Sequence, residues 1–325
     1  QPLVRHRGQW VELRPHDVEA VARLLDQNGD GNGAVRAVDA LRLAAGVQTV
    51  AGQIDVQSVI GHGWMAPLLE GEVHPEPLTT PPGLHGTLRP YQERGLAWLA
   101  FLDAVGLGAC LADDMGLGKT IQLLALLLHE RSQRRGSEPG PTLLVCPMSV
   151  VGNWQHEAAR FAPDLRVHVH HGGGRAGDAE QLAEAARKSD LVITTYALTA
   201  RDRDLLQAIE WHRVVLDEAQ NIKNNTAAQS RAVRALQAPR RIALTGTPVE
   251  NRLSELWSLM EFLNPGLLGS AREFRQNFIL PIERRQDEES AERLRRLTGP
   301  FILRRLKTDR GIIRDLPDKM EMKVY

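Results

Sequence analysis

The chain has 325 residues, of which 42% are apolar, 25% are charged and 5% are aromatic. These proportions are typical of a soluble globular protein and exclude a disordered chain, a collagen-like repeat and a disulfide scaffold. Because 40 basic residues balance 40 acidic ones, the whole-chain charge predicts no polyanionic partner, and any nucleic-acid surface must be a local patch.

Residues 1–85 differ from the rest of the chain. They carry six arginines against ten acidic residues, a net charge of −4. Apolar spacing predicts a strand over 10–13, a helical stretch over 18–25 and a second helix over 35–45 that ends at a glycine. A Pro-rich linker over 75–82 then marks a boundary. We therefore expect a small N-terminal accessory region with α+β structure.

From residue 86 onward, short apolar runs alternate with helical patterns. Apolar runs without polar alternation indicate parallel strands that are covered on both faces. Helical segments between such strands indicate a doubly wound sheet. The expected fold class is therefore α/β with a parallel sheet. The predicted strands cover residues 107–112, 142–146, 191–194, 213–216 and 241–244.

The apolar stretch over 95–112 approaches the length of a membrane span. Asp103 interrupts it, and Gly106 and Gly108 break it, so a helix, a turn and a buried strand are the better interpretation. The two cysteines of the chain lie in predicted strands and are interpreted as reduced core thiols. With no visible signal peptide, these features predict a cytoplasmic protein that has no membrane partner.

The segment 113–120 reads Asp-Asp-Met-Gly-Leu-Gly-Lys-Thr. It follows the predicted strand over 107–112 and opens a predicted helix over 121–130, which is the context that a phosphate-binding P-loop requires. The strict pattern begins with glycine, whereas this chain has Asp113 there. The alternative is a Gly-rich helix start that only packs, and the Gly-Lys-Thr sequence in this context disfavours it.

Each residue type in this loop suits a nucleoside triphosphate. Gly116 and Gly118 allow successive backbone N–H groups to point at an anion, and the helix N-terminus adds partial positive charge. Lys119 reaches the β and γ phosphates, and the Thr120 hydroxyl ligates magnesium. The residues expected at the nucleotide are Met115, Gly116, Leu117, Gly118, Lys119 and Thr120.

A second acidic element follows the predicted strand over 213–216. Asp217 and Glu218 come directly after this strand, at the end where α/β sheets bind ligands. Asp217 is expected to hold Mg2+, and Glu218 is expected to act as a general base, a role worth ~10²–10⁴ in rate. An isolated Asp-Glu pair would be interpreted as a solvated turn, but its combination with a P-loop favours catalysis by Lys119, Asp217 and Glu218.

Eight segments along the chain resemble, in their order, the motifs of superfamily-two helicases. More narrowly, they resemble those of the bacterial SWI/SNF-type DNA-dependent ATPases. The sequence Thr245-Gly246-Thr247-Pro248 discriminates best, because an RNA-unwinding DEAD-box protein is expected to carry Ser-Ala-Thr there. The matching segments cover residues 88–92, 113–120, 146–154, 194–196, 217–224, 244–251, 301–305 and 316–319.

The resemblance implies a RecA-like lobe that binds ATP and Mg2+ and contacts double-stranded DNA without sequence preference. Gln92 is the implied contact to the adenine base, and Thr245, Gly246 and Thr247 are implied to couple the nucleotide to DNA. Residues 247–250 also form a capping box that would start a helix over 251–263 whatever the function. The implied DNA contacts are Pro147, Met148, Ser149, Trp154, Thr194 and Thr195.

The resemblance also implies a domain organisation. Residues 86–325 correspond to the first RecA-like lobe, within which residues 264–310 form a helical protrusion. The stretch 284–314 carries ten basic and five acidic residues, a net charge of +5. The second RecA-like lobe is expected to be absent, together with its arginine fingers, which are worth ~10³–10⁵ in phosphoryl transfer. We therefore expect this fragment to bind ATP and hydrolyse it slowly.

Three functions remain open at this point. The first is the N-terminal ATPase lobe of a nucleoid-associated translocase that moves on double-stranded DNA and works with a second lobe of the same polypeptide. The second is a strand-separating helicase that acts on DNA or RNA. The third is a nucleotide-gated interaction module, in which residues 1–85 bind a protein partner.

Overall fold

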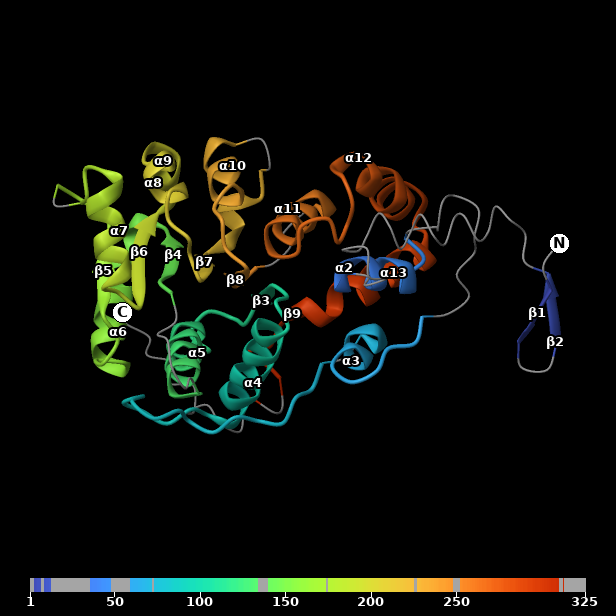
Figure 1. Cartoon of the computed structure of the whole chain (residues 1–325), viewed down its shortest axis with the longest axis horizontal. Coiled ribbons are helices and arrows are strands. Elements are labelled where there is room, and N and C mark those ends of the chain that lie inside the picture. Colours follow the sequence, from blue (N-terminus) through green and yellow to red (C-terminus); the bar gives the residue numbers. More distant parts are fainter. Residues whose placement is uncertain are drawn as a thin grey trace, which may run out of the picture. The chain divides into compact units, whose positions relative to one another are not determined.

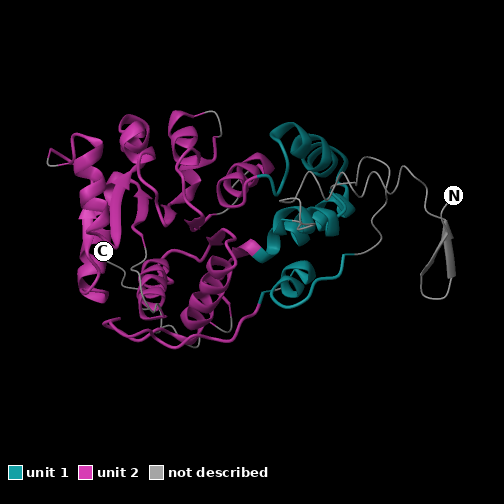
Figure 2. Ribbon diagram, viewed as in Figure 1, with its two compact units in different colours: residues 1–73, 266–300 teal, residues 74–265, 301–325 magenta. Residues whose placement is uncertain are grey.

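The computed structural model describes residues 3–6, 9–12, 36–47, 59–71, 73–133, 140–173, 175–224, 227–247, 252–309 and 312. The predicted helical stretch over 18–25, the Pro248–Asn251 part of the capping box and the segment 316–319 lie outside these residues. The chain divides into two compact units, which Figure 2 colours separately. Unit 1 comprises residues 1–73 and 266–300, and unit 2 comprises residues 74–265 and 301–325.

Unit 2 contains a seven-stranded sheet in the order β5-β6-β4-β7-β8-β3-β9. Every neighbouring pair of these strands is parallel, which confirms the predicted α/β fold with a parallel sheet. The strands are β3 (Ala109–Leu111), β4 (Thr142–Cys146), β5 (Val167–Val169), β6 (Leu191–Thr195), β7 (Arg213–Asp217), β8 (Arg240–Leu244) and β9 (Ile302–Leu303).

The five predicted strands form the centre of this sheet, and the two edge strands are missing from the prediction. Strands β3, β4 and β6 are buried at every residue, so their sequences are continuous apolar runs. Strands β5 and β9 are only two or three residues long and half-buried. They therefore lack the apolar run by which the others are found.

Helices cover both faces of the sheet. On one side α4 packs against α5 and α5 packs against α6, and on the other side α8, α10 and α11 form a second layer (Figure 1). The helices of unit 2 are α4 (Pro90–Ala104), α5 (Lys119–Gln133), α6 (Val151–Phe161), α7 (Ala179–Arg187), α8 (Tyr196–Arg201), α9 (Arg203–Gln207), α10 (Ala228–Arg234) and α11 (Leu253–Leu263), with the short 3-10 helices η1 (Met148–Val150) and η2 (Ala219–Ile222).

The apolar stretch over 95–112 folds as a helix, a turn and a buried strand, as predicted. Helix α4 ends at Ala104, the chain turns at Gly106 with a φ of +72°, and β3 follows. Both cysteines are buried, and burial raises the pKa of each thiol to about 12. Among the residues described here, no helix combines the length and hydropathy that a membrane crossing requires.

The Pro-rich segment between Val73 and α4 contains no helix or strand. It lies along α6, where the backbone N–H of His85 donates to the carbonyl of Phe161 over 2.8 Å. The Thr80 hydroxyl accepts a bond of 3.0 Å from the backbone N–H of Leu88, just before α4 begins. The segment therefore leads the chain onto the helical layer of unit 2, and the predicted domain limit at residue 85 stays a prediction.

The described part of unit 1 contains short helices and a pair of antiparallel strands. Its strand β2 covers the predicted strand over 10–13 within one residue, and α2 falls inside the predicted helix over 35–45, with Gly46 next to its end at a φ of +66°. The elements are β1 (Leu3–His6), which pairs antiparallel with β2 (Gln9–Glu12), and α2 (Ala37–Ala44), α3 (Met65–Glu70), α12 (Ala271–Phe274), the π-helix η3 (Arg275–Arg284) and α13 (Glu288–Thr298).

Candidate nucleotide site

The P-loop lies between β3 and α5, at the edge of the sheet where the strands end. Gly116 and Gly118 both have a φ of +82°, a conformation that only glycine adopts without strain. A Cβ atom on Gly118 would also lie 2.4 Å from the side-chain nitrogen of Gln92. The curled backbone of the loop therefore requires glycine at both positions, as the sequence predicted.

The side chains of the loop point in different directions. The Lys119 ammonium donates to the carbonyl of Asp113 over 2.7 Å and lies 3.5 Å from that of Asp114. Met115 is 71% exposed, whereas Leu117 is fully buried, so Leu117 can meet a nucleotide only through its backbone. Thr120 is half-buried in the first turn of α5.

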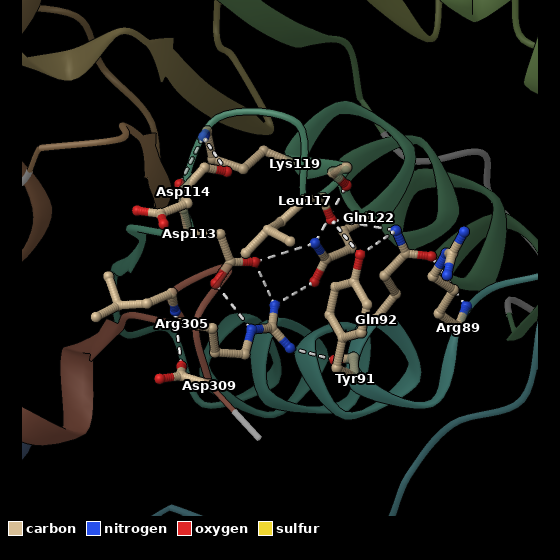
Figure 3. A network of polar contacts seen from close by, with 12 residues as sticks. Arg89, Tyr91, Gln92, Asp113, Asp114, Leu117, Lys119, Gln122, Arg305 and Asp309 are labelled. Atoms are coloured by element: carbon tan, nitrogen blue, oxygen red, sulfur yellow. Dashed lines mark hydrogen bonds and ion pairs between the residues drawn. The ribbon is translucent and has the colours of Figure 1, made fainter. Parts of the chain in front are cut away.

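Side chains of helix α4 donate hydrogen bonds to the loop (Figure 3). The hydroxyl of Tyr91 and the side-chain amide of Gln92 each donate to the carbonyl of Leu117 over 3.1 Å. The amide oxygen of Gln92 accepts from the backbone N–H of Arg89 over 2.9 Å. Both ends of Gln92 are thus bonded within the protein, and its contact with the adenine base stays a prediction.

The acidic pair lies at the same edge of the sheet, because β7 and β3 flank β8 and all three strands run parallel. One carboxylate oxygen of Asp217 accepts from the indole N–H of Trp154 over 2.7 Å, and the other accepts from the backbone N–H of Glu218 over 2.9 Å. The pKa of Asp217 is raised, chiefly by burial, although the bond from Trp154 acts in the opposite direction.

A chain of hydrogen bonds runs from Glu218 to the segment after β8. The side-chain amide of Gln220 donates to the Glu218 carboxylate over 2.8 Å and accepts from the Thr245 hydroxyl over 2.8 Å. That hydroxyl also accepts from the backbone N–H of Thr247 over 3.1 Å. Glu218 has a φ of +49°, a strained conformation that costs about 1–3 kcal/mol and persists only where the surroundings fix it.

Gly246 and Thr245 link this chain to the P-loop. The backbone N–H of Thr245 donates to the carbonyl of Leu111, the last residue of β3, over 3.1 Å. A Cβ atom on Gly246 would lie 3.4 Å from the Met115 side chain. The three residues predicted to couple the nucleotide to DNA therefore lie between the P-loop and the acidic pair. Their coupling role stays a prediction.

The residues predicted to contact DNA fall into two groups. Met148 and Ser149 are exposed on η1, directly after β4, and Pro147 is half-buried beside them. The other three are almost fully buried: Trp154 is 3% exposed, Thr194 is 0% exposed and Thr195 is 3% exposed. The structure thus favours Met148 and Ser149 as accessible positions, and DNA contact at all six residues stays a prediction.

Sequence reasoning missed Arg305 as a residue of this site. Its guanidinium donates to one Asp113 carboxylate oxygen over 2.8 Å and forms an ion pair with the other. Asp113 is fully buried, and Gln122 also donates to it over 3.3 Å. The signal was present in the sequence, because an aspartate that directly follows a predicted buried strand, where the pattern has glycine, requires a cationic or hydrogen-bonding partner.

Comparisons with known proteins agree with this geometry. A family model described as the SNF2-related domain matches residues 91–325, and a second one described as SNF2 Helicase protein matches residues 1–45. The chain is 41% identical to the putative ATP-dependent helicase/translocase YwqA of Bacillus subtilis, over 99% of this chain and 36% of that protein. It is 37% identical to the TATA-binding protein-associated factor mot1 of Schizosaccharomyces pombe, over 77% of this chain and 14% of that protein.

A solved structure also matches this chain in fold and sequence. The SWI2/SNF2 ATPase core of Sulfolobus solfataricus in complex with double-stranded DNA aligns with a TM-score of 0.68 and 45% identity, over 76% of this chain and 50% of that one. The chain spans well under half the length of the two curated relatives. The family resemblance and the RecA-like α/β lobe expected from the motifs are confirmed.

Proposed function

This chain belongs to the SNF2-related family, and from that premise we propose that it is the N-terminal ATP-binding lobe of a translocase that moves on double-stranded DNA. The single observation that carries the proposal is the convergence of the P-loop and the acidic pair at one sheet edge, because the parallel strands β3 and β7 flank β8. Parallel α/β sheets bind their ligands at this edge.

The residues of the edge suit ATP and Mg2+. Backbone N–H groups of the curled loop and the start of α5 would hold the phosphates, and Lys119 would leave its two carbonyl partners to reach them. The Thr120 hydroxyl and the Asp217 carboxylate are oxygen ligands, which Mg2+ prefers. Bound Mg2+ would neutralise charge that develops on the phosphates.

Glu218 is the proposed general base, and its strained backbone conformation suits that role. The positive φ and the bond from Gln220 fix its carboxylate relative to Thr245. A base must be held within hydrogen-bond reach of the proton that it removes. The bond chain to Thr247 then offers a route by which changes at the nucleotide alter the segment after β8.

Double-stranded DNA is the proposed partner, and support comes from a relative. The similar Sulfolobus core was solved in complex with double-stranded DNA. Contacts to phosphates make affinity fall steeply with salt and carry little sequence preference. The chain by itself is proposed to turn over ATP slowly, because arginines of a second lobe are expected to supply ~10³–10⁵ of the rate.

The test uses the longer natural protein that contains this chain, since the chain spans 36% of its relative YwqA. ATP turnover is measured with and without duplex DNA for the natural sequence, for Glu218→Gln and for Glu180→Gln, an exposed control on α7. We expect DNA to stimulate turnover, Glu218→Gln to reduce it ~10²–10⁴-fold with ATP affinity retained, and the control to change nothing.

Three results would refute this proposal. Unchanged turnover in Glu218→Gln would remove the assigned base. DNA affinity that does not fall with salt, or turnover that ignores DNA, would favour a nucleotide-gated interaction module instead. A strand-displacement assay on the same protein distinguishes a translocase, which leaves the duplex intact, from a strand-separating helicase.

A further inference from the structure

The segment after β9 runs alongside the P-loop. Strand β9 pairs with β3, and the pairing continues past both strands, because the backbone N–H of Asp114 donates to the carbonyl of Arg305 over 3.0 Å. The backbone N–H of Lys307 in turn donates to the Asp114 carboxylate over 3.0 Å. Residues 304–309 therefore form one wall of the loop, although almost 200 residues of sequence separate the two.

Arg305 fixes this wall. Besides its ion pair with the buried Asp113, its guanidinium donates to the backbone carbonyl of Tyr91 and to the side-chain oxygen of Gln122 (Figure 3). The guanidinium also lies over the Tyr91 ring at 5.2 Å. A guanidinium held from this many sides has little freedom to rotate. Arg305 is thus a positioning residue for the residues that follow it.

A turn then directs the next cation toward the loop. The Asp309 carboxylate accepts from the backbone N–H of Leu306 over 2.7 Å, and the backbone N–H of Asp309 donates to the carbonyl of Leu306 over 3.1 Å. Lys307 lies inside this turn. A Cβ atom built on Gly116 would lie 3.3 Å from the Lys307 ammonium nitrogen and 3.6 Å from its Cε atom.

The Lys307 ammonium therefore lies at the apex of the phosphate-binding loop. Lys307 is exposed, and across the described part of the chain no ion pair or hydrogen bond involves its ammonium. Lys119 differs, because its ammonium is bonded to the loop's own carbonyls. An unpaired cation beside curled backbone N–H groups increases the attraction for an anion.

We propose that Lys307 is a second cationic ligand of the nucleotide phosphates, supplied by the segment after β9 and held in place by the pair of Arg305 with Asp113. This inference rests on the proposed function, because it takes the P-loop to bind ATP. It adds a contact that no motif of the loop itself contains. It also makes residues 304–309 part of the nucleotide site.

The test measures ATP, ADP and adenosine binding by titration calorimetry, in the longer natural protein with Mg2+ present. Lys307→Ala is expected to weaken ATP binding about ten-fold, since charge-assisted bonds to phosphate are the strong ones, and to leave adenosine binding unchanged. Lys307→Arg, which keeps the charge, is expected to restore most of the affinity. Arg304→Ala is the matched control, because Arg304 is an exposed cation on the same segment.

The outcomes separate this inference from the proposed function. If the natural protein binds no ATP, or if Lys119→Ala binds it as tightly, the proposed function fails and this inference fails with it. If the natural protein binds ATP and Lys307→Ala binds it equally well, only the role of Lys307 is overturned. An equal loss in Arg304→Ala would also overturn it, because general charge would then explain both. Equal melting temperatures of the variants show that folding is intact.

Discussion

Two clusters of charged side chains lie at opposite edges of the sheet in unit 2, one where the parallel strands begin and one where they end. Where β7 begins, the fully buried Arg213 donates to both carboxylate oxygens of Asp103 over 2.9 and 2.7 Å and to Glu130 over 3.0 Å. His212 lies 2.7 Å from the second oxygen of Glu130. Where β7 ends, the carboxylates of Asp217 and Glu218 are bonded to an indole, a backbone N–H and an amide.

The difference lies in what neutralises the carboxylates. At the first edge a buried guanidinium pairs with two acids, so the cluster is closed. At the second edge the bonds to Asp217 and Glu218 come from neutral donors, burial raises the pKa of Asp217, and Glu218 has a strained backbone. A closed ion cluster stabilises the fold, whereas half-buried acids without a paired cation are typical of sites that bind a metal or transfer a proton.

The largest expected effect comes from a substitution that breaks the closed cluster around Arg213. Arg213→Met removes the buried cation that Asp103 and Glu130 share. It leaves Asp103 with Arg240, 2.9 Å away, and Glu130 with His212, so the free energy of unfolding should fall by about 3 kcal/mol. Urea denaturation measures this loss. Arg201→Met, at an exposed position in α8, is the matched control and should change the free energy by about 0.5 kcal/mol or less. A loss as small as that in Arg213→Met would contradict a stabilising role for this cluster.

A smaller effect tests the role of the edge that carries Asp217 and Glu218. Trp154→Phe removes the indole N–H that orients Asp217, so the Mg2+ concentration for half-maximal ATP turnover should rise about 10–100-fold, as for other residues that hold a metal ligand. Trp211→Phe is the control, because Trp211 also donates a buried indole bond, 2.8 Å to the carbonyl of Leu206, away from the site. If Trp154→Phe instead weakens DNA binding and leaves the Mg2+ requirement unchanged, its predicted DNA contact is favoured.

The smallest effect is a pH dependence of stability that comes from Glu130. Burial alone would raise the pKa of Glu130, but the bond with His212 and the charge of Arg213 outweigh burial and lower it. Its stabilising contribution is therefore complete above the unfolded value of about 4.3 and is lost as the pH falls below that value. Denaturation between pH 7 and pH 3 should show a shallower fall in Glu130→Gln, and an identical fall would contradict the assignment.

Local patterns in the sequence were sufficient to predict the central strands of the sheet, the P-loop and the acidic pair. The five central strands are continuous apolar runs because helices cover both of their faces. The P-loop is recognisable because its curled backbone needs a positive φ at two positions, and glycine is the residue that adopts it without strain. The acidic pair follows a predicted strand, and parallel strands bring their ends to one edge. Such features depend on neighbours in sequence, so the sequence determined them.

Only the tertiary structure decided which side chains support this edge. Arg305 meets Asp113 across 192 residues of sequence, and Trp154 meets Asp217 across 63. The sequence marked Asp113 as unusual and placed Trp154 near DNA, but neither partner is readable from spacing. The two-residue strand β9 brings Arg305 and Lys307 to the P-loop, and a strand that short has no pattern of its own. Contacts between distant segments depend on strand order, which no local pattern contains.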